Sequence, residues 1–215
     1  MSLSAQQAAA ALGVSRMQIS RLVHQGNLRA SRLGNALMID PQSVNEYRSL
    51  RPDRGRPLSP RKAWERIAEE STRSAALDEG ALMESVRQLA IVARRRADRQ
   101  PYRVLPNRLP ALFADDRVVL SGAAAAQQHG APVRPGDPHP VYVSIDDLSG
   151  LVADYRLRDD GDPNVIVRAV DPGEWILGHQ IAPPFVAAID ALDDGDARSA
   201  AEIVRHLIQV AGAQR

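Results

Sequence analysis

The chain contains no cysteine, which excludes disulfide bonds and thiolate metal sites. Lysine is nearly absent too: of 27 basic residues, Lys62 is the one lysine and the others are arginine. Long hydrophobic runs are also lacking, since the apolar stretches are too short or too polar to cross a bilayer. No basic-then-apolar leader opens the chain, so we expect a cytoplasmic protein without a membrane partner.

Motifs of common enzyme classes are missing as well. The sequence has no Walker-type phosphate loop, no nucleophile elbow and no zinc-protease motif. Its 5 histidines are scattered without metal-ligand spacing. The acidic run at 159–162 could bind Ca²⁺, although a solvated loop is the simpler interpretation. We therefore expect no enzymatic activity, no cofactor and no bound metal.

What the sequence does have is a separation of charge. Residues 1–110 carry 19 basic and 10 acidic side chains, a net charge of +9, whereas residues 111–215 carry 8 and 16, a net charge of −8. A basic half attracts a polyanion such as DNA, and an acidic half is repelled by it. The two halves are therefore predicted to have different roles.

Residues 1–50 predict a winged helix-turn-helix domain. Ser4 caps a helix over 5–12 that Gly13 closes, and Ser15 caps a second helix over 16–25 that Gly26 ends. Apolar residues at helical spacing would hold the two helices together, namely Ala8, Leu12, Val14, Ile19, Leu22, Val23 and Leu28. The order of these elements predicts a helix-turn-helix.

A hairpin and a third helix complete this domain. Gly34-Asn35 suits a tight turn, so Leu33 and Leu37 are expected on flanking strands that form the wing. A short helix over 41–48 follows, with Pro41 at its first position.

The outward face of the second helix supplies the candidate DNA contacts. Burying its apolar side leaves six residues facing solvent: Arg16, Met17, Gln18, Ser20, Arg21 and His24. Arg16 and Gln18 are the expected base readers, because arginine matches guanine edges and glutamine matches adenine. The wing adds Arg29 and Arg32 as phosphate contacts. His24 is ambiguous, since a histidine at a helix end is more often a capping or surface group.

Two arginine-rich stretches lie beyond this domain. Residues 49–60 read as an extended connector, in which Arg54 and Arg56 could enter an A·T minor groove or form a solvated tether. The run at 93–99 is favoured as a basic helix end that complements the helix dipole, over a phosphate contact.

The rest of the chain predicts a two-helix connector and a small α/β domain. Helices over 61–70, with Trp64 and Ile67, and over 78–97 would form the connector, and Pro101 would end the second. Strands and helices then alternate. Strands are expected at 102–106, 117–122, 140–145 and 164–170, with helices at 122–130, 146–157, 183–195 and 196–211. The predicted domains are 1–50, 51–101 and 102–215, giving a mixed fold of class α+β and α/β.

The N-terminal stretch "LSAQQAAAALGVSRMQISRLVHQGNLRASRLGNALMID" resembles the excisionase and MerR-like helix-turn-helix family over about residues 3–50. The small wing after "GNL" is the most specific part of this resemblance. The resemblance implies binding to double-stranded DNA. The family includes repressors, excisionases and phage proteins, so it does not imply one purpose.

The stretch "VLSGAAAAQQHGAP" looks like the start of a minimal nucleotidyltransferase domain. In working members the following strand carries Asp-x-Asp, whose carboxylates hold the metal that phosphoryl chemistry needs. Here Val141 and Val143 stand at those positions. Asp146 and Asp147 follow at the start of a helix, where adjacent side chains point apart. The domain is therefore expected to be a degenerate, catalytically silent relative.

Taken together, "VVLSGAAAAQQHGAP", "VYVSIDDLSGLV", "NVIVRAV" and "APPFVAAIDALDDGDARSAAEIVRHL" resemble the C-terminal domain of the AbiEi family over about residues 102–210. That resemblance implies an antitoxin and autorepressor of a type IV toxin–antitoxin pair, whose toxin is a nucleotidyltransferase. We expect a transcriptional regulator that represses its own operon, with the acidic half pairing subunits as a homodimer or binding another protein. Two alternatives remain, an excisionase or immunity repressor of a mobile element and a degenerate enzyme that binds a nucleotide as a signal.

Overall fold

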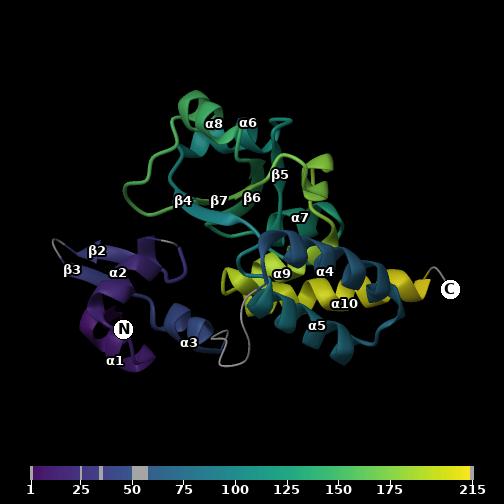
Figure 1. Cartoon of the computed structure of the whole chain (residues 1–215), viewed down its shortest axis with the longest axis horizontal. Coiled ribbons are helices and arrows are strands. Elements are labelled where there is room, and N and C mark those ends of the chain that lie inside the picture. Colours follow the sequence, from purple (N-terminus) through teal and green to yellow (C-terminus); the bar gives the residue numbers. More distant parts are fainter. Residues whose placement is uncertain (1, 25, 34–35, 50–57, 214–215) are drawn as a thin grey trace.

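The computed structural model describes residues 2–24, 26–33, 36–49 and 58–213. They form a small N-terminal domain, residues 2–49, and a larger body that begins at residue 58 (Figure 1). Helix and strand are mixed in both parts, as the sequence predicts. No helix among these residues is long and apolar enough to cross a membrane.

The N-terminal domain begins with two short helices in a helix-turn-helix arrangement. Helix α1 (Ala5–Leu12) is capped by Ser4 through a capping box, and Gly13 ends it at a φ of 62°. Helix α2 (Arg16–His24) starts where the Ser15 hydroxyl accepts a hydrogen bond from the backbone N–H of Gln18 at 3.2 Å. Both predicted caps are confirmed.

A small sheet and a third helix follow. Strands β2 (Ala30–Leu33) and β3 (Ala36–Ile39) form the predicted antiparallel hairpin, and α3 (Pro41–Ser49) begins at the predicted proline. Strand β1 (Leu3–Ser4) pairs with β3 and makes the sheet three-stranded, which the sequence did not indicate. The domain has its own apolar core, formed by Ala8, Ala9, Leu12, Ile19, Leu22, Leu28, Ile39 and Val44.

The body is built on a mixed four-stranded sheet with the order β4-β7-β6-β5. Its strands are β4 (Asp98–Tyr102), β5 (Val118–Leu120), β6 (His139–Ser144) and β7 (Val165–Val170). Strands β6 and β7 are parallel and are joined through α8 (Leu148–Tyr155), whereas both edge strands run antiparallel to their neighbours. Strand alternation sends successive side chains to opposite faces of this sheet.

Each face of the sheet has its own apolar core. Val141 and Val143 face α8 and α6 (Leu109–Phe113), a short helix that was not predicted. Tyr142 faces the larger core, which the sheet shares with helices on its other side. These are α4 (Pro60–Arg73), α5 (Glu79–Val92), α7 (Gly122–Gln128), α9 (Pro184–Asp193) and α10 (Ala197–Ala213). Three short 3₁₀ turns lie between elements, at Ser74–Ala76, Pro106–Arg108 and Trp175–Gly178.

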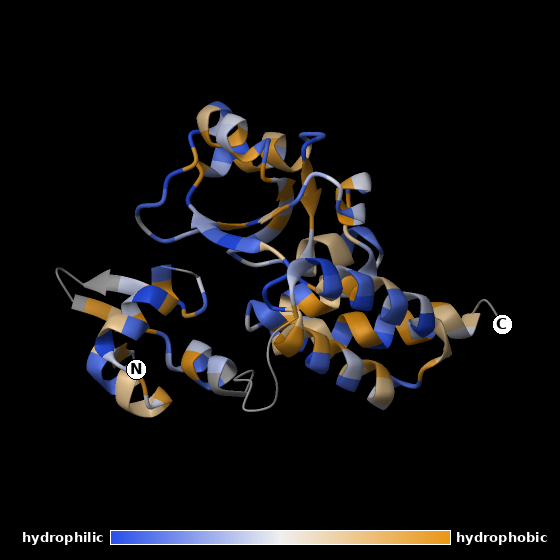
Figure 2. Cartoon of the chain, viewed as in Figure 1, coloured by the Kyte–Doolittle hydropathy of each residue, from blue (hydrophilic) through white to orange (hydrophobic). Residues whose placement is uncertain are grey.

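Helices α4 and α5 are part of the body, although the sequence analysis assigned them to a connector. Trp64 and Ile67 of α4 are fully buried, and they share one core with Phe185 of α9 and Ile203 of α10. Figure 2 shows apolar residues concentrated where α5, α9 and α10 meet. These helices therefore pack against the sheet and belong to the same domain, instead of forming a connector to the N-terminal domain.

The boundary near Pro101 also differs from the prediction. Helix α5 ends at Val92 instead of Ala97, and β4 covers 98–102 instead of 102–106. Pro101 does not stop a helix; it lies inside β4 and pairs with Ile166 of β7. A proline is tolerated there because β4 is an edge strand, whose outward side needs no N–H donor.

Candidate nucleic-acid interface

The outer face of α2 is the first part of the candidate interface. Ile19 and Leu22 are buried against α1, which turns the opposite side of the helix outward. Five of the six predicted contact residues are exposed there: Arg16, Met17, Ser20, Arg21 and His24. The Met17 side chain is 82% exposed, so it is accessible to a binding partner.

Gln18 is placed differently. It is only half-exposed and lies on the flank of α2, where it lines a cleft between the N-terminal domain and the body. Its role as a base reader, like that of Arg16, stays a prediction.

Among the arginines predicted to contact the DNA backbone or minor groove, the structure describes the side chain of Arg29 only. The Arg29 guanidinium pairs with Asp40 at 3.0 Å and also donates a hydrogen bond to the backbone carbonyl of Asp194 at 3.2 Å. Arg29 thus links the N-terminal domain to the body. Arg32 lies in β2, but its side chain is not among those described, and Arg54 and Arg56 lie outside the described residues.

Gly26 lies where the N-terminal domain contacts the body, a boundary that we call the seam. Its φ is +65°, a conformation that glycine adopts cheaply, and a Cβ built on it would lie 2.7 Å from an Arg99 guanidinium nitrogen. Arg99 in turn pairs with the Asp194 carboxylate at 2.6 Å. The end of α2 is therefore fitted closely against the body.

A matched pair of substitutions tests this fit. Gly13 has a φ of +62°, but a methyl added there would meet nothing within 4 Å, so Gly13→Ala should cost about 1–2 kcal/mol from backbone strain alone. Gly26→Ala should lose about 1 kcal/mol more, because Arg99 must also move away from its carboxylate. Urea unfolding of both variants measures the difference. Equal losses of unfolding free energy in the two variants would show that Arg99 can move away from position 26 without an added cost.

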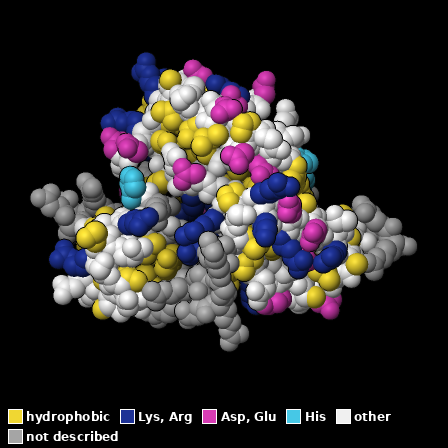
Figure 3. Space-filling view, in the orientation of Figure 1, with side chains coloured by type: hydrophobic (Ala, Val, Ile, Leu, Met, Phe, Trp, Pro, Cys, Tyr) yellow, Lys and Arg dark blue, Asp and Glu magenta, His cyan; other side chains and the backbone are white. Residues whose placement is uncertain are grey.

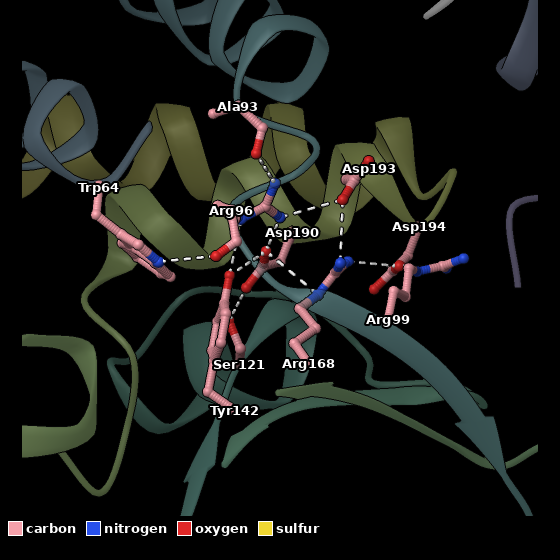
Figure 4. A network of polar contacts seen from close by, with 10 residues as sticks. All are labelled: Trp64, Ala93, Arg96, Arg99, Ser121, Tyr142, Arg168, Asp190, Asp193 and Asp194. Atoms are coloured by element: carbon pink, nitrogen blue, oxygen red, sulfur yellow. Dashed lines mark hydrogen bonds and ion pairs between the residues drawn. The ribbon is translucent and has the colours of Figure 1, made fainter. Parts of the chain in front are cut away.

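Behind the seam, a buried polar network holds the body together (Figure 4). Asp190 of α9, at 0% exposure, is its centre. Its carboxylate accepts hydrogen bonds from Arg96, the Ser121 hydroxyl and the Tyr142 hydroxyl, and it lies 3.5 Å from the Arg168 guanidinium. One carboxylate thus connects α9, the turn after α5, the turn after β5, and both central strands.

The network extends from Asp190 toward the seam. Asp193 bridges Arg96 and Arg168 at 3.1 Å to each. Asp194 then bridges Arg168 and Arg99 at 2.6 Å to each. Three carboxylates from the end of α9 therefore face three arginines, and the last carboxylate belongs to the residue whose carbonyl Arg29 contacts.

Burial and charge shift the ionisation of these groups. Burial raises the pKa of the Asp193 carboxyl, but Arg96, Arg168 and Arg99 outweigh it and leave the pKa below its usual value. Burial likewise lowers the pKa of Arg96, and Tyr142 with the two nearest carboxylates brings it well above normal. The pKa of Tyr142 is raised, chiefly by burial. These shifts favour the charged forms of Arg96 and Asp193 and the neutral form of Tyr142.

This cluster does not resemble a metal centre. Within the described ranges, no group of three or more histidine or acidic residues is arranged to hold a metal ion. Val141 and Val143 are packed in the core on the face of β6 away from Asp190. Asp190 and Asp193 could not be identified from the sequence, because their partners lie far away in the chain, at separations of up to 97 residues.

The second part of the candidate interface is the cleft that Gln18 lines. It has a volume of about 620 Å³ and lies between α2, the turn after α5, and the carboxyl ends of β6 and β7. Figure 3 shows Lys and Arg side chains gathered in this hollow. Arg21 lines it from α2, and Arg94, Arg95, Arg96 and Arg99 line it from the body.

Comparison with known proteins identifies one part of the chain. Residues 2–49 match the family model described as a helix-turn-helix domain, which is the class that the capped α1–α2 pair defines. The match supports a DNA-binding role for this domain. No curated protein and no solved structure shows significant similarity to the chain.

Proposed function

We propose that the protein is a sequence-specific DNA-binding transcriptional regulator in which α2 enters the major groove. The observation that carries this proposal is the outward face of α2, which presents Arg16, Met17, Ser20, Arg21 and His24 on a helix-turn-helix domain. Donors and an apolar side chain on one exposed helix face suit base edges and thymine methyls. The β2–β3 hairpin acts as the wing beside it.

The body acts as a folding and binding module in this proposal, not as an enzyme. The carboxylate that Ser121 contacts is Asp190, and it and the other two carboxylates at the end of α9 are each paired with arginine. Phosphoryl transfer needs carboxylate oxygens that are free to hold Mg²⁺. Paired and buried carboxylates suit a structural role.

The finer role that we propose is repression of the protein's own operon. The AbiEi-type resemblance of residues 102–210 extends this to the antitoxin of a pair whose toxin is a nucleotidyltransferase, with two copies pairing through the body. Growth of cells that co-express a neighbouring nucleotidyltransferase gene, with and without this protein, tests the antitoxin role. If the toxicity persists when this protein is present, the antitoxin role is wrong and only the role as a regulator remains.

Selection from a random duplex pool with the full chain tests DNA recognition directly. We expect one enriched sequence motif, and Arg16→Ala and Gln18→Ala should each weaken binding to it by about 1–3 kcal/mol. Binding to a scrambled duplex should change little, because base contacts are lost and phosphate contacts are kept.

Arg158→Ala and Gln128→Ala are the matched controls. Both positions are exposed, lie on the body and do not line the cleft. They should leave binding to the enriched motif unchanged. A pool without enrichment, or equal losses on both duplexes for Arg16→Ala and Gln18→Ala, would contradict recognition through α2.

A further inference from the structure

The arginines of the basic run at 93–99 have two different environments in the structure. Arg96 and Arg99 turn into the buried network, where carboxylates neutralise both. Arg94 and Arg95 lie in the turn between α5 and β4, and neither has an ion pair or hydrogen bond from its side chain to any part of the chain that the structure describes. A guanidinium without a carboxylate is available to an anion from outside.

The two arginines stand opposite the recognition helix. Both line the 620 Å³ cleft whose other wall carries Gln18 and Arg21. Arg94 also lines the small pocket at the seam, together with Gly26 and Tyr47 of the N-terminal domain. The turn after α5 therefore continues the basic surface of α2 across the domain boundary, as the hollow in Figure 3 shows.

The acidic residues of the cleft do not neutralise this surface. Asp193 is held by Arg96 and Arg168. Asp98, at the start of β4, accepts a hydrogen bond from Gln100 at 2.8 Å and forms no ion pair with Arg94 or Arg95. Asp171 and Glu174 lie beyond the carboxyl end of β7, where they would repel phosphate from that part of the cleft. An anion is thus favoured on the side nearest to α2, at Arg21, Arg94 and Arg95.

We propose that Arg94 and Arg95 bind backbone phosphates of the same duplex whose major groove α2 enters. The inference rests on the proposed function. The cleft is far too small to admit a duplex, so the phosphate strand would cross its mouth beside Gln18 while α2 occupies the groove. Phosphate contacts that flank a recognition helix fix its register on the DNA, and guanidinium groups suit them because they donate two parallel hydrogen bonds. The body, acidic in its overall charge, would thereby contribute directly to DNA binding.

Salt titration of duplex binding measures these contacts. With a random-sequence 30-base-pair duplex, the variant Arg94→Ala plus Arg95→Ala should reduce the slope of log K against log salt by about 2 and lower affinity roughly 50-fold at 0.1 M salt. Arg73→Ala plus Arg205→Ala removes the same two charges from exposed positions outside the cleft, where each arginine is already paired with a glutamate. That control should keep the slope of the wild type.

A second measurement does not depend on charge. Because the chain has no cysteine, Arg95→Cys creates a single site for a photo-crosslinker, and Arg205→Cys is its control. The label at position 95 should crosslink to the duplex and the label at 205 should not.

The outcomes separate the two proposals. Equal salt slopes for the two double variants, or no crosslink from position 95, would overturn the inference. The proposed function would still be tested separately, by the effect of Arg16→Ala on binding to the enriched motif. A wild-type chain that binds no duplex at low salt would overturn the inference together with the proposed function.

Discussion

Replacing Asp190 with alanine is expected to destabilise the body by about 3–5 kcal/mol. The substitution removes the more deeply buried of the two carboxylates, Asp190 and Asp193, that face both Arg96 and Arg168, whose side chains are 1% and 2% exposed. Both charges would remain buried with less compensation, and the hydroxyls of Ser121 and Tyr142 would lose their acceptor. Such a loss is a large share of the stability of an ordinary domain.

Urea unfolding followed by circular dichroism measures this effect. Asp154→Ala is the matched control, because Asp154 also pairs with an arginine, Arg117, but is 57% exposed. An exposed ion pair contributes about 0–1 kcal/mol, so the control should unfold close to the wild type. A loss for Asp190→Ala no larger than that of Asp154→Ala would mean that the network adds little to stability.

Replacing Trp64 with alanine is the second substitution with a large expected effect, about 3–5 kcal/mol. Its ring packs edge-on against Tyr142 at 5.4 Å and Trp175 at 5.6 Å, and its N–H donates to the Arg96 carbonyl at 2.9 Å. The side chain is 1% exposed, so alanine would leave a cavity and an unpaired carbonyl in the core.

This residue also tests the division of the chain into domains. Because α4 and α5 share the core of α9 and α10, residues 58–213 should unfold in one cooperative transition that Trp64→Ala shifts as a whole. A fragment of residues 102–215 should fail to fold, since it lacks α4, α5 and most of β4. Met17→Ala, at an exposed position, should leave the unfolding midpoint unchanged. A stable 102–215 fragment would instead support a separate connector.

Much of the N-terminal domain could be predicted because its signals are local. Ser4 and Ser15 cap the helices that directly follow them, and Gly13 and Gly26 adopt the positive φ that ends each one. Helical spacing also identified the apolar side of α2, since its core partners lie in the same 50 residues. The outward face of α2 follows from that assignment, and with it the candidate contacts.

The C-terminal predictions were accurate for most strands and failed where packing overrides local signals. Pro101 is a helix breaker by local rules, yet it lies in an edge strand because β7 is beside it. Helices α4 and α5 have the amphipathic pattern of any surface helix, which does not say whether they cover a neighbouring sheet or each other.

By itself the sequence determined the helix-turn-helix, the hairpin, the apolar faces and the separation of charge, because caps, turns and periodicity act over a few residues. Only the tertiary structure decided which arginines of the run at 93–99 pair with a carboxylate and which do not. Arg96 and Arg99 pair with carboxylates that follow almost 100 residues later, whereas Arg94 and Arg95 line a cleft whose other wall is α2. Identical side chains in one run therefore have different surroundings, because their partners are set by the folding of α9 against the sheet.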